Sequence, residues 1–250
     1  MTAPVADAVL RVVIEGKRFP ALGDAPPRHV LGPLRLVLAA HEVLVVTGPS
    51  GCGKTTLLNL VAGLDEEVDG RIERPGQGRL AYVFQEPRLL PWRTVEQNLA
   101  LVLPRDAAAR GRVARVLDEV GLAEAATTYA SRLSLGMARR VALARAFVVE
   151  PDLLLLDEPF ASLDRATAQR LRLLLLDLLE TRRAAALFVT HDLEEAVLLG
   201  QRLLVLTASP ATVAAELPIA LDPALRRDEA AVAARTAELR AELRARGVLP

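Results

Sequence analysis

The 250-residue chain has little cysteine, little lysine, few aromatic residues and no net charge. Cys52 is its single cysteine, so an intrachain disulfide framework is excluded and a reducing, cytoplasmic compartment is expected. The 31 basic and 31 acidic residues balance, and the chain therefore lacks the positive field of a protein built to hold nucleic acid. No apolar run approaches the ~18 residues of a membrane-spanning helix, so another chain is expected to do any spanning.

Apolar runs separated by turn residues predict strands that alternate with helices. Unalternated runs such as 42–47 are typical of parallel strands covered on both faces, so the pattern predicts an α/β layered fold with a largely parallel sheet. The segment 20–33, rich in proline and glycine, is expected to be loop. The expected strands are 9–14, 42–47, 80–84, 153–156, 186–190 and 202–206, and the expected helices are 55–62, 107–120, 134–149, 166–181, 193–199 and 228–246.

One glycine-rich segment carries a specific motif. Gly48-Pro-Ser-Gly-Cys-Gly-Lys54-Thr55 fits G-x-x-x-x-G-K-S/T, directly after a predicted strand and at the start of a predicted helix. Its glycines let backbone N–H groups point at phosphate oxygens, Lys54 is placed to reach the β- and γ-phosphates, and Thr55 offers a hydroxyl to magnesium. The alternative is an accidental turn, in which Cys52 is an inert filler. Every other basic residue except Lys17 is arginine, and Lys17 is expected to be an ordinary surface residue.

Two carboxylates follow the predicted strand 153–156. Asp157 and Glu158 are expected at the carboxyl edge of the sheet, where ligands of α/β proteins bind. Asp157 suits magnesium, and Glu158 suits the polarisation of an attacking water. The alternative is that one of the pair caps the next helix.

His191 follows a further predicted strand, where it could contact the γ-phosphate from the far side.

Three more segments complete an ordered set of motifs: Gln85 after the strand 80–84, Leu133-Ser-Leu-Gly-Met137, and Ser162-Leu-Asp164. Over nearly its whole length the chain therefore resembles the ATP-binding cassette superfamily. The resemblance implies ATP and Mg²⁺ as cofactors and a mostly parallel sheet with an antiparallel β portion and an α-helical insertion. It implies a single cassette, 1–250, with a nucleotide-binding core at 1–93 and 150–220, a helical part with the signature at 94–149 and a helical tail at 221–250.

The resemblance also implies roles for individual residues. Phe19 is the candidate for stacking on adenine, with His29 as the alternative. Two copies are expected to face each other head to tail, each ATP lying between the phosphate loop of one and the signature of the other. The implied sites are, for catalysis, Glu158, His191 and Gln85; for ATP, Phe19, Gly48, Pro49, Ser50, Gly51, Cys52, Gly53, Lys54, Thr55 and Thr56; for metal, Thr55, Gln85 and Asp157; and, toward the partner's ATP, Ser134, Gly136 and Asp164.

The segment VFQEPRLLPWRTVEQNLALVL is similar to ATP-binding subunits of bacterial importers for nitrate, sulfonates and taurine. This similarity implies separate permease subunits, a periplasmic solute-binding protein and a place on the cytoplasmic face of the membrane. Leu89, Leu90 and Trp92 are expected to contact the permease, although Trp92 suits core packing equally well. Export or lipid handling, a cassette ATPase acting on DNA or ribosomes, and a weakly hydrolysing module remain alternatives.

The signature departs from the family pattern at one position. Leu135 stands where the family has glycine, which removes the freedom for a positive φ and adds bulk. We expect Leu135 either to weaken closure of the dimer or to be accommodated by a small shift.

Overall fold

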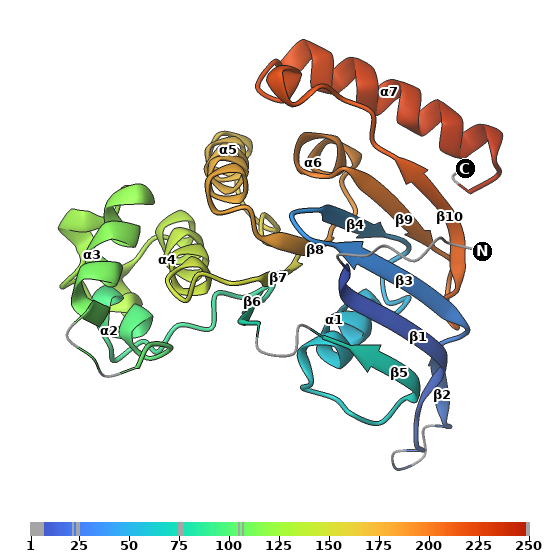
Figure 1. The fold of residues 1–250 in the computed structure, drawn as a ribbon, viewed down its shortest axis with the longest axis horizontal. Helices are drawn as coiled ribbons and strands as arrows, with labels where there is room; N and C mark the ends of the chain where they lie inside the picture. The colour runs from blue at the N-terminus through green and yellow to red at the C-terminus, as the bar shows by residue number, and fades with distance from the viewer. Residues whose placement is uncertain are drawn as a thin grey trace. The chain divides into compact units, whose positions relative to one another are not determined.

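The computed structural model describes residues 8–21, 23, 26–74, 78–104, 106 and 108–248. The chain divides into two compact units, residues 1–78 with 185–250 and residues 79–184. Figure 1 colours both by position along the chain. No helix within the described ranges is long and apolar enough to cross a membrane.

The first unit contains an antiparallel sheet built around the long strand β1, which pairs with β2, β3 and β5. Inward-facing Leu10, Val12 and Ile14 are buried, and a bulge between Lys17 and Arg18 interrupts the pairing with β2. The strands are β1 (Ala8–Phe19), β2 (Arg28–Leu31), β3 (Leu34–Ala39) and β5 (Asp69–Glu73).

The same unit also holds parallel strands. β4 (Val43–Thr47) lies between β8 (Ala185–Val189) and β9 (Arg202–Leu206) and is parallel to both, while β10 (Val213–Pro218) pairs antiparallel with β9. Every residue of β4 and β8 is buried, as expected for strands covered on both faces. The helices are α1 (Lys54–Ala62), α6 (Leu193–Leu199), η3 (Pro223–Leu225) and α7 (Glu229–Ala245).

The second unit is mainly helical. Its strands β6 (Leu80–Val83) and β7 (Leu153–Asp157) pair in parallel, and every residue of β7 is buried. The helices are α2 (Val95–Ala100), α3 (Ala108–Glu119), η1 (Ala123–Ala125), η2 (Ala130–Arg132), α4 (Leu135–Phe147) and α5 (Arg165–Arg182).

The predicted α/β class and the predicted strands and helices are confirmed, apart from their end residues; Ala107 lies outside the described residues. The expectation of loop throughout 20–33 is wrong, because Arg28–Leu31 forms β2 with Val30 and Leu31 buried. Strands β3, β5 and β10 were not predicted. The division at residues 93, 150 and 220 stays a prediction.

Candidate nucleotide site

The phosphate loop connects buried β4 to α1 in the backbone conformation that its glycines predict. Gly53, the residue before α1, has φ 117°, and Gly51 has φ 73°. A Cβ on Gly53 would lie 2.8 Å from both Val30 Cγ1 and Leu31 Cδ2, so strand β2 packs directly against the loop. The N-cap residue of α1 is Gly53, which makes no side-chain cap, and the N-terminus of a helix is a favourable place for an anion.

Lys54 is buried and folds back over the loop that carries it. Its ammonium donates to the carbonyl oxygens of Gly48 at 2.9 Å and Pro49 at 3.0 Å. The cation is thus held among the loop carbonyls, where a phosphate would be an alternative partner. Thr55 is exposed, whereas the Cys52 thiol is buried beside Gly48, in keeping with an inert filler.

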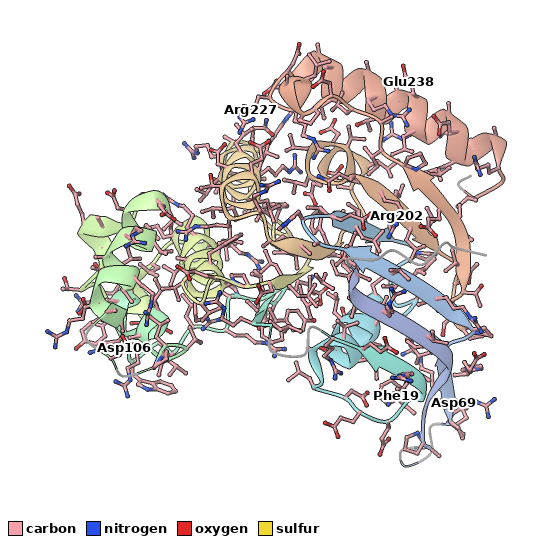
Figure 2. The ribbon with its side chains drawn as sticks, in the orientation of Figure 1. Phe19, Asp69, Asp106, Arg202, Arg227 and Glu238 are labelled. Atoms are coloured by element: carbon pink, nitrogen blue, oxygen red, sulfur yellow. The ribbon has the colours of Figure 1, made fainter. Side chains whose placement is uncertain are left out.

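Strand β2 also brings Phe19 toward the loop. Phe19 pairs in register with Arg28, whose guanidinium donates to the Gly51 carbonyl at 3.0 Å. The Phe19 ring is 38% exposed and lies at the end of β1 (Figure 2). His29, the alternative base-stacking residue, pairs with Arg18 and has a buried Nε2 next to Gly16, so Phe19 offers the more open surface.

His191 lies in a turn fixed by side-chain hydrogen bonds. The Thr190 hydroxyl donates to buried Glu195 and accepts from the Asp192 backbone N–H, and Asp192 in turn caps α6. His191 is exposed between these anchored neighbours. The turn holds the His191 backbone at the carboxyl end of β8, after the strand that the sequence predicts there.

In the second unit, Asp157 is buried as the last residue of β7 and Glu158 follows with φ 42°. Such left-handed backbone is uncommon for a non-glycine residue and concentrates at functional sites. Tyr82 on β6 forms a side-chain hydrogen bond with Asp157, and the pKa of Tyr82 is raised by burial first and then by the Asp157 charge. Sequence reasoning missed Tyr82, since only strand pairing brings it to Asp157.

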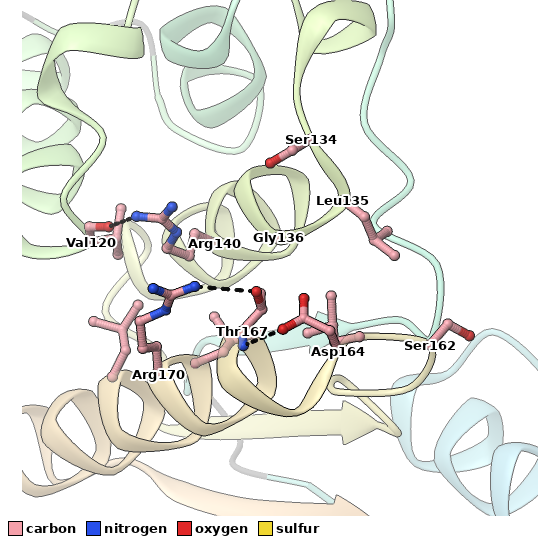
Figure 3. Close-up of a pocket in the computed structure, with 12 residues that line it drawn as sticks. Val120, Ser134, Leu135, Gly136, Arg140, Ser162, Asp164, Thr167 and Arg170 are labelled. Carbon is pink, nitrogen blue, oxygen red and sulfur yellow. Dashed lines mark hydrogen bonds between the residues drawn. The ribbon is translucent and has the colours of Figure 1, made fainter.

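The signature and the segment before α5 line one cavity of about 620 Å³ (Figure 3). Ser134 caps α4 by accepting from Met137 N–H, and Asp164 caps α5 by accepting from Thr167 N–H. Hydrogen bonds from the Thr167 hydroxyl first and then from its backbone N–H lower the pKa of Asp164, which stays ionised. Leu135 is 44% exposed as the first residue of α4, and its φ is not positive. It is therefore accommodated without left-handed backbone strain.

Two arginines of α4 hold the segment that follows β6. Arg139 donates to the carbonyl oxygens of Gln85 and of Ala161, and Arg145 donates to those of Pro87 and Arg88, both at 2.8 Å. Burial lowers the pKa of Arg139, but a guanidinium keeps its charge. These positioning residues were missed, because no local pattern reveals which arginines are buried.

Trp92 is 67% exposed, so the core-packing alternative is wrong. Its loop is fixed by buried Asn98, which accepts from Leu90 N–H at 2.8 Å and donates to the carbonyl of Thr94 at 3.0 Å. Thr94 also forms a bridge with Tyr129, which is 48% exposed. The loop therefore presents exposed Trp92, with exposed Tyr129 bridged to its end at Thr94, while Leu89 and Leu90 are half-buried.

A strand, a glycine-rich turn and an uncapped helix with a buried lysine together define a P-loop nucleotide-binding protein. Residues 31–161 match the family model described as ABC transporter. The chain is 42% identical over 244 residues to the aliphatic sulfonates import ATP-binding protein SsuB 2 of Burkholderia cenocepacia, covering 95% of this chain and 88% of the relative. It is 43% identical to SsuB of Bacillus subtilis, covering 85% and 86%.

Solved structures of ATP-binding cassettes share the fold of this chain. The dimeric ATP-binding cassette MJ0796 in a post-hydrolysis state bound to ADP and Pi has a TM-score of 0.72 and 25% identity, covering 85% of this chain and all of that one. The chain belongs to the ABC transporter family, as an ATP-hydrolysing cassette.

Close packing of α4 on α5 generates one prediction. A Cβ on Gly136 would lie 2.7 Å from Thr167 Cγ2, and β-branched threonine cannot easily move its methyl. Gly136→Ala should lower the free energy of unfolding by ~1–3 kcal/mol in urea titrations. Thr167→Ser removes that methyl, so Gly136→Ala/Thr167→Ser should recover most of the loss. If the double variant recovers no stability, the contact with the Thr167 methyl is not what excludes a side chain at Gly136.

The hydrogen bond between Tyr82 and Asp157 generates another. Tyr82→Phe should lower the free energy of unfolding at neutral pH by ~1.5–3 kcal/mol, because buried Asp157 loses a donor. Since the folded protein holds Tyr82 neutral, this advantage is complete below the unfolded pKa of 10.0 and shrinks as the pH rises above it. Equal stability of the two proteins in urea at pH 7 would contradict the assignment.

Proposed function

We propose that the chain hydrolyses ATP to power the import of aliphatic sulfonates through separate membrane permease subunits. The observation that carries the proposal is the preformed phosphate loop, in a chain 42–46% identical to several proteins named for aliphatic sulfonate import. A sulfonate is a small, permanently charged anion, which needs a permease and an energy source to enter a cell.

Each step of ATP binding and hydrolysis has a residue suited to it. On ATP binding, the Lys54 ammonium leaves its loop carbonyls for the β- and γ-phosphates. Backbone N–H groups of the loop and of the first turn of α1, between Gly48 and Thr56, bind phosphate oxygens, apart from Pro49, which has no N–H, and Cys52, whose N–H donates to the Pro49 carbonyl. Phe19 stacks on adenine. Glu158 accepts the proton of the attacking water, and His191 contacts the γ-phosphate.

The residues present fit a magnesium ion held largely by water and phosphate. Mg²⁺ prefers oxygen ligands and takes few protein ligands in phosphate sites, and this chain offers a hydroxyl, an amide and a carboxylate oxygen. Bound Mg²⁺ would neutralise charge on the phosphates. Thr55, Gln85 and Asp157 would hold it, with Tyr82 fixing the Asp157 carboxylate.

A second copy completes each site. Ser134, Gly136 and Asp164 face the ATP held by the partner, with the Ser134 O–H still free to donate after its oxygen caps α4. The dimeric state of MJ0796 supports a pair of chains, and a head-to-tail arrangement is proposed because it brings each signature to the partner's ATP.

The permease is proposed to dock on the loop of Leu89, Leu90 and Trp92, because an exposed tryptophan on a hydrogen-bonded loop is typical of interface anchors. Arg139 and Arg145 tie the preceding segment to α4, so movement of that loop would reach the signature. The proposal puts the protein on the cytoplasmic face of the membrane, in a system with a periplasmic solute-binding protein.

Hydrolysis tests the proposal in vitro. Glu158→Gln should bind ATP with wild-type affinity and lose at least ~100-fold in ATP turnover, because the water loses its base. Glu124→Gln, an exposed carboxylate of the same unit, serves as the matched control. Near-wild-type turnover by Glu158→Gln would remove Glu158 as the base.

Uptake tests it in cells. A strain lacking the chain should fail to take up a labelled aliphatic sulfonate, and wild type or Glu124→Gln should restore uptake while Glu158→Gln should not. Unchanged uptake in the deletion strain would contradict the sulfonate proposal and leave the ATPase result standing.

A further inference from the structure

Lys17, expected at the surface, is 1% exposed. Its ammonium donates to Asp65 at 2.8 Å and lies 4.6 Å from the centroid of the Phe19 ring. Burying an ammonium is costly unless it is paired, and here one carboxylate and one aromatic face pair it. The geometry therefore joins one of the two lysines to the proposed adenine platform.

Asp65 fixes the position of this cation. It follows the end of α1, where Leu64 and Asp65 N–H both donate to the Asn59 carbonyl, and its Oδ1 also accepts from Glu67 N–H at 3.1 Å. The platform is thus tied to the helix that begins at the phosphate loop. Lys17 covers one face of a ring that is 38% exposed, which leaves other ring surface open to solvent.

We propose that Lys17 is a positioning residue that orients and polarises Phe19 for stacking on the nucleobase, and so sets the affinity for the base rather than for the phosphates. This inference rests on the proposed ATP-binding function. A cation on one face draws electron density from the ring, which favours stacking of an electron-rich purine on the other face. The ion pair also holds the ring before the base arrives, which lowers the entropic cost of binding.

The test compares ATP with inorganic tripolyphosphate, which has no base, by calorimetry on the full chain. Lys17→Met should weaken ATP binding about three- to tenfold and leave tripolyphosphate binding unchanged. Lys17→Arg, which can pair with Asp65 and stack on the ring, should recover most of the ATP affinity. Arg18→Met removes an exposed cation from the same strand end and should change neither affinity.

Equal losses for ATP and tripolyphosphate would mean that Lys17 only holds α1 in place, and would overturn the proposal. Unchanged ATP affinity in Lys17→Met would also overturn it. Phe19→Ala distinguishes this outcome from a failure of the Phe19 platform itself. If Phe19 stacks on the base without help from Lys17, ATP binding weakens in Phe19→Ala but not in Lys17→Met. If Lys17→Met does not fold, Asp65→Asn should give the same selective loss in weaker form, and its absence would count against the proposal.

Discussion

The ammonium of Lys54 donates to two carbonyl oxygens of its own loop, and the arrangement of the phosphate site depends on that contact. The loop can curl around it because Gly51 and Gly53 adopt positive φ values. The curl is held from both sides, by β4 fixed between β8 and β9 and by β2 packed against Gly53. A compact ammonium suits this nest of backbone groups better than a planar guanidinium would, which fits its use in a chain that otherwise prefers arginine.

The lysines and the arginines of α4 make different contacts, which follow from the shapes of their charged groups. Both lysines of the first unit are buried point charges, Lys54 at the phosphate loop and Lys17 at the Phe19 ring. In the second unit the planar guanidinium groups of Arg139 and Arg145 each bind two carbonyl oxygens. Those bonds join α4, which begins at the signature, to the Gln85 segment and to Ala161, so the proposed permease loop and the proposed partner contacts share one helix.

Much of the site was predictable because its motifs follow short buried strands. The phosphate loop, the Asp157–Glu158 pair and His191 each come directly after an unalternated apolar run, and such runs are read from local sequence. The roles of those residues toward ATP stay proposals. Strand β2 was missed because prolines and glycines surround it and only pairing with β1 makes it a strand. The burial of Lys17 and the bond between Tyr82 and Asp157 depend on residues 48 and 75 positions away, which no local pattern shows.

When nucleotide binds, the Lys54 ammonium is proposed to leave its loop carbonyls for phosphate. The chain has only two lysines, so a sample labelled with ¹⁵N at lysine Nζ gives two NMR signals, which Lys17→Arg reduces to one and so assigns. Saturating ATP or tripolyphosphate should shift the Lys54 signal strongly, because a carbonyl environment is replaced by a multiply charged anion. A Lys54 signal that stays in place while calorimetry reports bound nucleotide would contradict the account.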